Sequence, residues 1–293
     1  MTGHRQDDFQ ESQFYRVVAG GSVALSMFIL AATVAVASDH ARPPPLLLPP
    51  FKVGQELSFE FTMTEHDRNA DSQFSESTLQ EAFDIKILAV TSKEARLVWT
   101  LHDAAGTGEF GWGPQYFAAL KGVPVELRTD ASGFPRSIAN WDTLKERLSA
   151  DITDKTALDH LRMLDEQSQS LSGMDLFSPA LLTMSDIQTR DSIAFGRTRL
   201  PDRDVQPLEM ARVMRVVRNV SFLGIDSGQC LARVAHDITA TTEDKTKPAM
   251  QMVTTTSGVV STSDGWTVSL HETGTAPNFV ESTEIHRTTA NPC

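Results

Sequence analysis

Four histidines beside charged residues are the side chains of this 293-residue sequence that are best suited to chemistry. They form the pairs His102-Asp103, His236-Asp237, His271-Glu272 and His286-Arg287, near the ends of predicted strands. Imidazole can act as a general base or bind zinc, but a zinc site needs three or four ligands on one side of a sheet. The alternation of residues places His102 opposite the Leu97-Trp99-Leu101 face and His236 on the same face as Val234, so no metal ligand is nominated.

A hydrolase with an unrecognised site remains an alternative at this point. It requires His102, His236 and His271 to converge with a carboxylate at a hydrogen-bond distance of about 3 Å. No Gly-x-Ser-x-Gly, Ser-x-x-Lys, His-Glu-x-x-His or Walker sequence is present. The acidic pairs Glu65–Asp67 and Asp202–Asp204 fall in predicted loops, where paired carboxylates are usually solvated.

Three glycines between Gly106 and Gly111 have the spacing of a dinucleotide-binding loop. The helix expected after them, from Pro114 to Leu120, is too short to direct a useful dipole at a pyrophosphate. We therefore nominate no catalytic or cofactor-binding residue, and we expect a protein that is not an enzyme and has no cofactor.

The uncharged run from Val17 to Ala37 follows Arg16 and ends in Ala35-Val36-Ala37, which is typical of an export signal. Residues 1–37 are predicted to be a signal peptide or a signal anchor. Small residues before position 38 favour cleavage, whereas a length of about 20 residues also suits a membrane span. We expect an exported protein, periplasmic or secreted, or alternatively one anchored in the inner membrane with its domain outside.

Residues 38–50 contain five prolines and are predicted to be a stiff spacer, since proline fixes φ and removes a backbone donor. Residues 51–290 are predicted to form a single β-rich domain. The net charge of -12 and the lack of a basic block exclude nucleic acid as a partner. Contact with a membrane is expected only through the N-terminal segment, if that segment is retained.

Cys230 and Cys293 are the two cysteines of the chain. In an oxidising compartment they could form one disulfide, which would stabilise the fold by about 2–4 kcal/mol. The alternative is a pair of unpaired thiols, one on a strand and one at a frayed terminus.

Apolar residues recur at every second position after Phe51, which predicts antiparallel strands with one buried face. The clearest runs are Leu57-Phe59-Phe61-Met63, Phe83-Ile85-Ile87-Ala89 and Ala95-Leu97-Trp99-Leu101. The period becomes helical over residues 140–189, with Asn140 as a predicted N-cap. Alternation then returns, with separate strands expected around Met252, around Val259 and over 266–270, and a last strand over 279–285. This order predicts an α+β fold: a mainly antiparallel, curved, half-barrel-like sheet with a helical insertion.

Two predicted hairpins carry an acidic residue, a glycine turn and a proline, at Asp130–Pro135 and at Glu272–Pro277. With the export segment, the meander of strands and the helical insertion, they resemble exported bacterial proteins of the lipoprotein-carrier type, and also exported β-rich domains without an assigned activity. The resemblance implies a curved sheet that wraps around helices and encloses an apolar cavity.

Soft apolar side chains could line such a cavity or fill an ordinary core. The candidates are Trp99, Trp141, Met184 and Met252. The sequence thus favours an exported, non-catalytic envelope protein that binds an apolar or lipidic ligand or an envelope protein. A structural or interaction module anchored by its N-terminal helix is the alternative.

Overall fold

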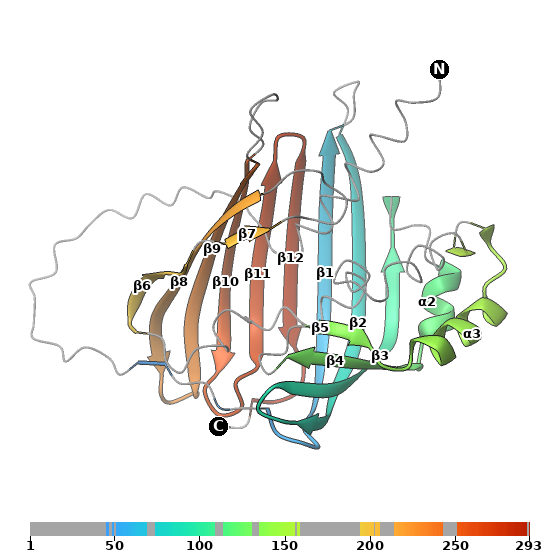
Figure 1. Cartoon of the computed structure of the whole chain (residues 1–293), viewed down its shortest axis with the longest axis horizontal. Helices are drawn as coiled ribbons and strands as arrows, with labels where there is room; N and C mark the ends of the chain where they lie inside the picture. Colours follow the sequence, from blue (N-terminus) through green and yellow to red (C-terminus); the bar gives the residue numbers. More distant parts are fainter. Residues whose placement is uncertain are drawn as a thin grey trace, which may run out of the picture.

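The chain folds around one curved, open antiparallel sheet, as the α+β prediction required. The computed structural model describes residues 45–46, 49, 51–68, 74–108, 114–130, 135–155, 157–158, 194–201, 203–205, 214–242, 251–291 and 293. Its strands lie in the order β5-β4-β3-β2-β1-β12-β11-β10-β9-β8-β6, and β7 pairs with β8 outside this path. Figure 1 shows the long strands side by side in a single layer.

The strands are long in the middle of the sheet and short at its two ends. Their bounds are β1 Glu56–Arg68, β2 Phe74–Val90, β3 Glu94–Gly106, β4 Pro124–Asp130, β5 Pro135–Ile138, β6 Gly196–Arg199, β7 Arg203–Val205, β8 Met214–Asp226, β9 Leu231–Thr242, β10 Gln251–Ser261, β11 Thr267–Ala276 and β12 Phe279–Arg287. Residues 1–44 and 159–193 lie outside the described part of the chain.

The predicted alternation holds in the first three strands. Leu57, Phe59 and Phe61 of β1 are buried, and they pair with the buried odd-numbered residues of β2. Leu97, Trp99 and Leu101 of β3 are also buried on this side, which we call the inner face. The even-numbered residues of β1 and β2 lie on the outer face. In these strands, the alternation of apolar and polar residues therefore correctly predicts which face is buried.

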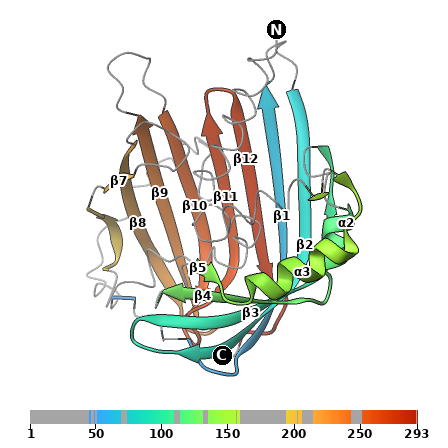
Figure 2. The same cartoon turned by 45° about the vertical axis from the view of Figure 1, so that its right-hand side comes forward.

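Two irregularities in the pairing of β2 with β3 allow the sheet to bend. The register shifts between Ala82 and Phe83 and again between Ile87 and Ala89, and such bulges bend a strand and increase its twist. Beyond this bend, β4 and β5 run across the direction of β1 and β12 in both views (Figures 1 and 2). The end of the sheet thus curls over its own inner face.

Two helices pack at this curled end. They are α2, Pro114–Leu120, and α3, Trp141–Asp151. Of the predicted helical segment 140–189, the described part thus holds α3 and a short helical stretch near residue 157. Asn140 is the N-cap residue of α3, as predicted, but its side chain makes no capping hydrogen bond. Its Oδ1 accepts from Glu126 N at 2.9 Å and its Nδ2 donates to Pro124 O at 2.9 Å, which ties the start of α3 to β4.

The main core lies between the curled sheet and the two helices. Aromatic rings occupy its middle: the ring centroids of Phe59 and Phe83 are 5.6 Å apart, and those of Phe83 and Trp99 are 5.9 Å apart. A second buried cluster lies on β8, β9 and β10, and it contains Leu46 from the predicted proline-rich spacer. At least this residue of the spacer packs on the sheet.

Two strand predictions in the C-terminal half are wrong. Met252 and Val259 belong to one strand, β10, and not to two. The glycine of the second predicted hairpin, Gly274, lies within β11 opposite Glu281, and the turn falls at positions 277–278. Glycine is typical of turns because it permits positive φ. Within a strand, as at Gly274, it instead leaves room beside a neighbouring side chain.

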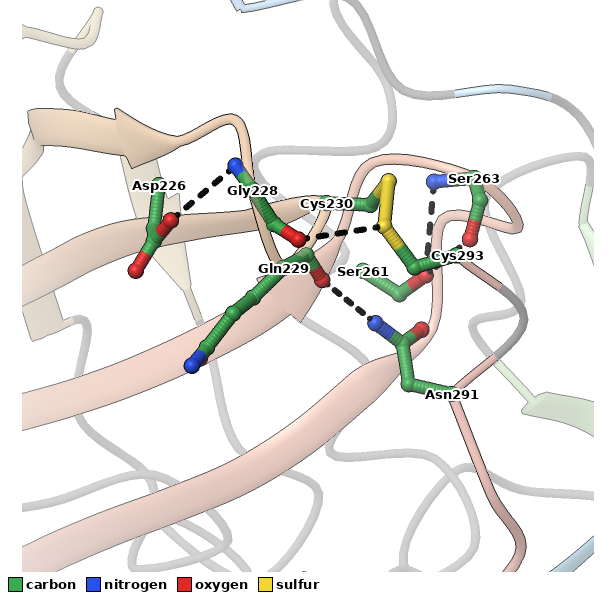
Figure 3. Close-up of a disulfide and its surroundings, with 8 residues drawn as sticks. All are labelled: Asp226, Gly228, Gln229, Cys230, Ser261, Ser263, Asn291 and Cys293. Atoms are coloured by element: carbon green, nitrogen blue, oxygen red, sulfur yellow. Dashed lines mark hydrogen bonds between the residues drawn. A yellow bond between two sulfur atoms is a disulfide. The ribbon is translucent and has the colours of Figure 1, made fainter.

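Cys230 and Cys293 are joined by a disulfide, with their Cα atoms 5.5 Å apart (Figure 3). Cys230 ends the turn between β8 and β9, and the bond ties the last residue of the chain to this turn. Asn291 Nδ2 also donates to Gln229 O at 2.9 Å. For a sequence separation of 63 residues, the loss of chain entropy in the unfolded state corresponds to about 4 kcal/mol.

Candidate functional site

A band of buried polar side chains crosses the inner face above the aromatic core. Its members come from β2, β1, β12, β11 and β10 and are each at most 5% exposed: Ser77, Glu65, Glu281, Thr283, Glu272, Thr256 and Thr254. We call this set the polar band. It is unusual because charged residues are rarely fully buried in folded proteins.

Strand pairing brings the members of the polar band together. Glu65 lies directly opposite Glu281, and Glu272 lies between Thr283 on one side and Thr256 on the other. The Thr256 hydroxyl donates a hydrogen bond to Glu272 Oε2, and Thr283 Oγ1 donates to Glu281 Oε1 at 3.2 Å. Hydrogen bonds to a carboxylate offset part of the cost of burying it.

A fourth buried carboxyl, Glu81, lies apart from this band in apolar surroundings. It is on β2, opposite Phe61 of β1 and Ala104 of β3, and Leu79 and Phe83 flank it on the same face. Glu81 is 5% exposed, and its Oε2 atom has no hydrogen-bond partner. Burial raises the pKa of Glu81 to about 8, so the side chain is a neutral carboxylic acid at pH 7.

Tyr116 of α2 is the titratable neighbour of Glu81. It is fully buried, and burial together with the Glu81 carboxylate raises the pKa of its phenol above the ordinary value. A neutral carboxyl and a phenol can both donate and accept hydrogen bonds. The pair is therefore a small polar spot on an aromatic surface.

The bulge in β3 lies next to this spot and sets the direction of its neighbours. Ala82 pairs with Asp103 and Phe83 pairs with Leu101, so His102 is the extra residue. His102 is exposed, and its Nε2 lies 2.6 Å from Asp84 Oδ2 on the outer face. The bulge lets Leu101 and Ala104 both lie on the inner side, the latter opposite Glu81.

The three histidines of the hydrolase alternative do not converge. His102 and His271 lie on the outer face, where each contacts a different carboxylate, Asp84 or Glu284. His236 lies on β9 opposite Thr256 of the polar band. These histidines therefore do not form one catalytic site, because strand alternation separates them onto two faces of the sheet. In the described part of the chain, no three His, Cys, Asp or Glu side chains are grouped to hold a metal ion.

An open groove of about 300 Å³ lies on the outer face over β8 to β12. Leu223, Arg233, Ser257, His271, Glu284 and His286 are among its lining residues. Glu284 lies between the two histidines, with its carboxylate oxygens 3.4 Å from His271 Nδ1 and 4.0 Å from His286 Nε2. These three side chains are more than half exposed, so the groove is a solvated surface.

The sequence-based assignment of the acidic pair Glu65–Asp67 to a loop is wrong. Both residues lie in β1, which continues to Arg68, and Glu65 is 2% exposed. Of the other acidic pair, Asp204 lies in β7, and Asp202 falls outside the described residues. The signal for Glu65 was its odd position, which continues the buried alternation of Leu57, Phe59 and Phe61. Glu81 has the same signal, between Leu79 and Phe83.

Three of the four predicted cavity-lining residues are described, and all three are buried. Trp99, Trp141 and Met252 are 1%, 7% and 4% exposed, and Trp99 packs against Phe83 in the main core. Met184 lies outside the described residues. Trp99 lies on β3, the strand that carries Ala104 opposite Glu81, so the aromatic core and the buried carboxyl belong to one surface.

No family model matches this chain, and no curated protein matches its sequence. A lipovitellin structure that concerns lipid–protein interactions is similar over 83% of this chain, with 9% identity and a TM-score of 0.42. The match spans 26% of that protein, about a quarter of its length.

Two further solved structures match over most of the chain. An exported protein with a YmcC-like fold from Bacteroides fragilis shows 10% identity and a TM-score of 0.23, over 84% of this chain and 100% of the other. DynF, from the dynemicin biosynthesis pathway of Micromonospora chersina, shows 6% identity and a TM-score of 0.23, over 92% and 95%. These TM-scores are too low to support an inference about function.

Proposed function

We propose that the protein is an exported, non-catalytic carrier that holds an apolar or lipidic ligand against the inner face of its curved sheet. The observation that supports this proposal is the construction of that face. Aromatic and aliphatic side chains cover it from β4 to β1, a second apolar cluster covers it on β8 to β10, and buried polar groups interrupt it. Apolar surfaces with a few placed polar groups are typical of sites for small amphiphilic molecules.

The cover provided by the described helices is limited to one end of the sheet. Both α2 and α3 lie beside β2, β3 and β4 (Figure 2), and α2 packs against β3 and α3. In this proposal the ligand extends along the strands beside the buried apolar clusters and the polar band. Neither of these two helices has the length and apolar content that a bilayer crossing needs.

Export is part of the proposal, and the pairing of Cys230 with Cys293 supports it. Disulfides persist in oxidising compartments and are rare where thiols are kept reduced. The mass of the intact protein recovered from the periplasm or medium tests both points, since cleavage after position 37 and loss of two thiol hydrogens each change it. Recovery of the reduced, uncleaved chain from the cytosol would contradict export.

The ligand-binding test uses the delipidated protein and cis-parinaric acid, a fatty acid whose absorption overlaps tryptophan emission. We expect saturable binding with energy transfer from Trp99, Trp141 and Trp266, which are buried in the main core. Trp99→Phe should reduce the transfer. Absence of saturable binding by the folded protein would rule out the carrier function.

A further inference from the structure

The structure assigns Glu81 and Tyr116 as the polar anchor for the head of the bound ligand, and the ligand as a lipid whose head carries a carbonyl oxygen, such as a long-chain carboxylic acid or its ester. This inference rests on the proposed carrier function. In this inference the inner face binds lipids with a carbonyl head, and Glu81 is the residue that distinguishes them from other apolar ligands.

Glu81 is buried on the inner face and lacks a partner there. Its side chain is 5% exposed and points from β2 onto the inner face, and Oε2 has no hydrogen-bond partner. Leaving a buried polar atom without a partner is unfavourable. Such a cost is expected where the partner is supplied by a molecule that the protein binds.

The surroundings of Glu81 are mainly apolar. Phe61, Leu79 and Phe83 are buried around the carboxyl, and Tyr116 is the titratable side chain that faces it. Glu65, the nearest carboxyl of β1 on this face, lies four residues beyond Phe61, with Met63 between them. A head group that reaches Glu81 would therefore have these apolar side chains as its neighbours.

Glu81 and Tyr116 are both protonated at neutral pH. With a pKa of about 8, Glu81 is protonated at neutral pH and donates a hydrogen bond through its O–H. Tyr116 keeps its proton as well, because burial and Glu81 raise the pKa of the phenol. Two neutral O–H donors on an apolar surface suit a carbonyl or carboxylate oxygen. They suit an ammonium head poorly, because a cation requires an ionised carboxylate.

Glu81 and Tyr116 lie near the end of the pairing between β3 and β4. β4 pairs with β3 only from Glu94 to Thr100, so Ala104 lies on a stretch of β3 beyond the end of this pairing. The Ala104 side chain is small and partly exposed, and it lies opposite Glu81. A head group at Glu81 would therefore lie near the edge of the sheet, with the aromatic core alongside it.

The experiment measures binding of three probes to the delipidated, disulfide-bonded protein at pH 6.5. The probes are dansylaminoundecanoic acid, its methyl ester, and pyrene, which is apolar and has no carbonyl. The variants are Glu81→Leu and Glu81→Gln. Glu60→Gln is the matched control, since Glu60 is an exposed carboxylate on the outer face of β1. Near-UV circular dichroism reports whether each variant keeps the native packing.

We expect Glu81→Leu to bind the acid and the ester about tenfold more weakly than the wild type, and pyrene equally well. Glu81→Gln keeps a donor and should retain most of the affinity. The ester does not titrate, so its binding to the wild type should weaken several-fold at pH 9.5, where Glu81 is ionised, and its binding to Glu81→Gln should not.

Two outcomes separate failure of the anchor from failure of the carrier function. Equal binding of acid and ester by the wild type and Glu81→Leu would overturn the anchor and leave the carrier intact. If the folded wild type binds none of the probes, pyrene included, both inferences fail. Preference for the acid over the ester, or the reverse, identifies which carbonyl head the site takes.

Discussion

Glu81 and Asp84 lie three residues apart on β2 and face opposite sides of the sheet. The Asp84 side chain is 42% exposed and contacts His102 at 2.6 Å, whereas Glu81 is 5% exposed and its Oε2 lacks a partner. Both are carboxyl groups on one strand, so the difference between them comes only from the face to which each belongs. Charged groups on the outer face stay hydrated, so they cost little free energy. On the inner face a charged carboxyl would lose its hydration, so Glu81 is neutral there.

A third carboxyl shows what burial requires when the charge is kept. Asp264, in the turn between β10 and β11, is 2% exposed, and its Oδ2 lies 2.8 Å from Nη1 of Arg287. Its Oδ1 accepts from Trp266 N at 3.1 Å. Asp264 therefore has a structural role, since its carboxylate has partners within the protein. The Oε2 atom of Glu81 has none, which fits the proposed ligand-binding role.

The pH dependence of stability gives the largest expected difference between the two faces. The unfolded-state pKa of Glu81 is 4.5 and its folded-state value is about 8. Below pH 4.5 both states are protonated, and between these values the unfolded chain loses a proton that the native protein keeps. Glu81 therefore makes the free energy of unfolding fall as pH rises from 4.5 to 8, by about 5 kcal/mol in total at 1.36 kcal/mol per pKa unit.

Urea unfolding of the wild type and Glu81→Gln at several pH values measures this contribution. The variant should gain stability relative to the wild type as pH rises, and the difference should become constant above about pH 8.5. The outer-face variant Glu60→Gln should follow the wild type. Parallel curves for the wild type and Glu81→Gln would show that Glu81 is ionised in the native protein.

Breaking the buried pair at Asp264 should give the next largest effect. Asp264→Ala leaves Arg287 buried without its counter-charge, so we expect a loss of about 3–5 kcal/mol in the free energy of unfolding. The double variant Asp264→Ala with Arg287→Met removes the uncompensated charge and should recover part of this loss. If Asp264→Ala changes the free energy of unfolding by less than about 1 kcal/mol, the buried pair contributes no more than the exposed ion pairs of the outer face.

The polar band can be tested at Thr256, whose hydroxyl donates to Glu272 on the neighbouring strand. Thr256→Val keeps the shape and removes the donor, and a hydrogen bond to a charged group contributes about 1.5–3 kcal/mol. The matched control is Thr255→Val, one residue away on the outer face of β10. Equal effects of the two substitutions on the unfolding free energy would mean that Glu272 does not depend on this bond.

Much of the sheet could be predicted from the sequence, because a period of two and the order of the elements reflect burial on one face. Leu57, Phe59 and Phe61 identified the inner face of β1, and the α+β class followed. The burial of Glu65 and Glu81 does not follow from residue type, because carboxylates usually lie in water. Only their odd positions in the alternation indicate the inner face. Their partners and the curl of β4 and β5 depend on strand neighbours distant in sequence, which a single chain does not reveal.

The smallest effect is expected on the outer face, at the pair formed by Asp84 and His102. Both side chains are about half exposed, so their interaction is screened by water and salt. Asp84→Asn should change the free energy of unfolding by less than about 1 kcal/mol, and a double-mutant cycle with His102→Gln should give a coupling of similar or smaller size. A coupling above about 2 kcal/mol would mean that the bulge at His102 fixes the bend of β3 through this contact. The position of Ala104 opposite Glu81 would then depend on the outer face, and the two faces could not be treated as independent.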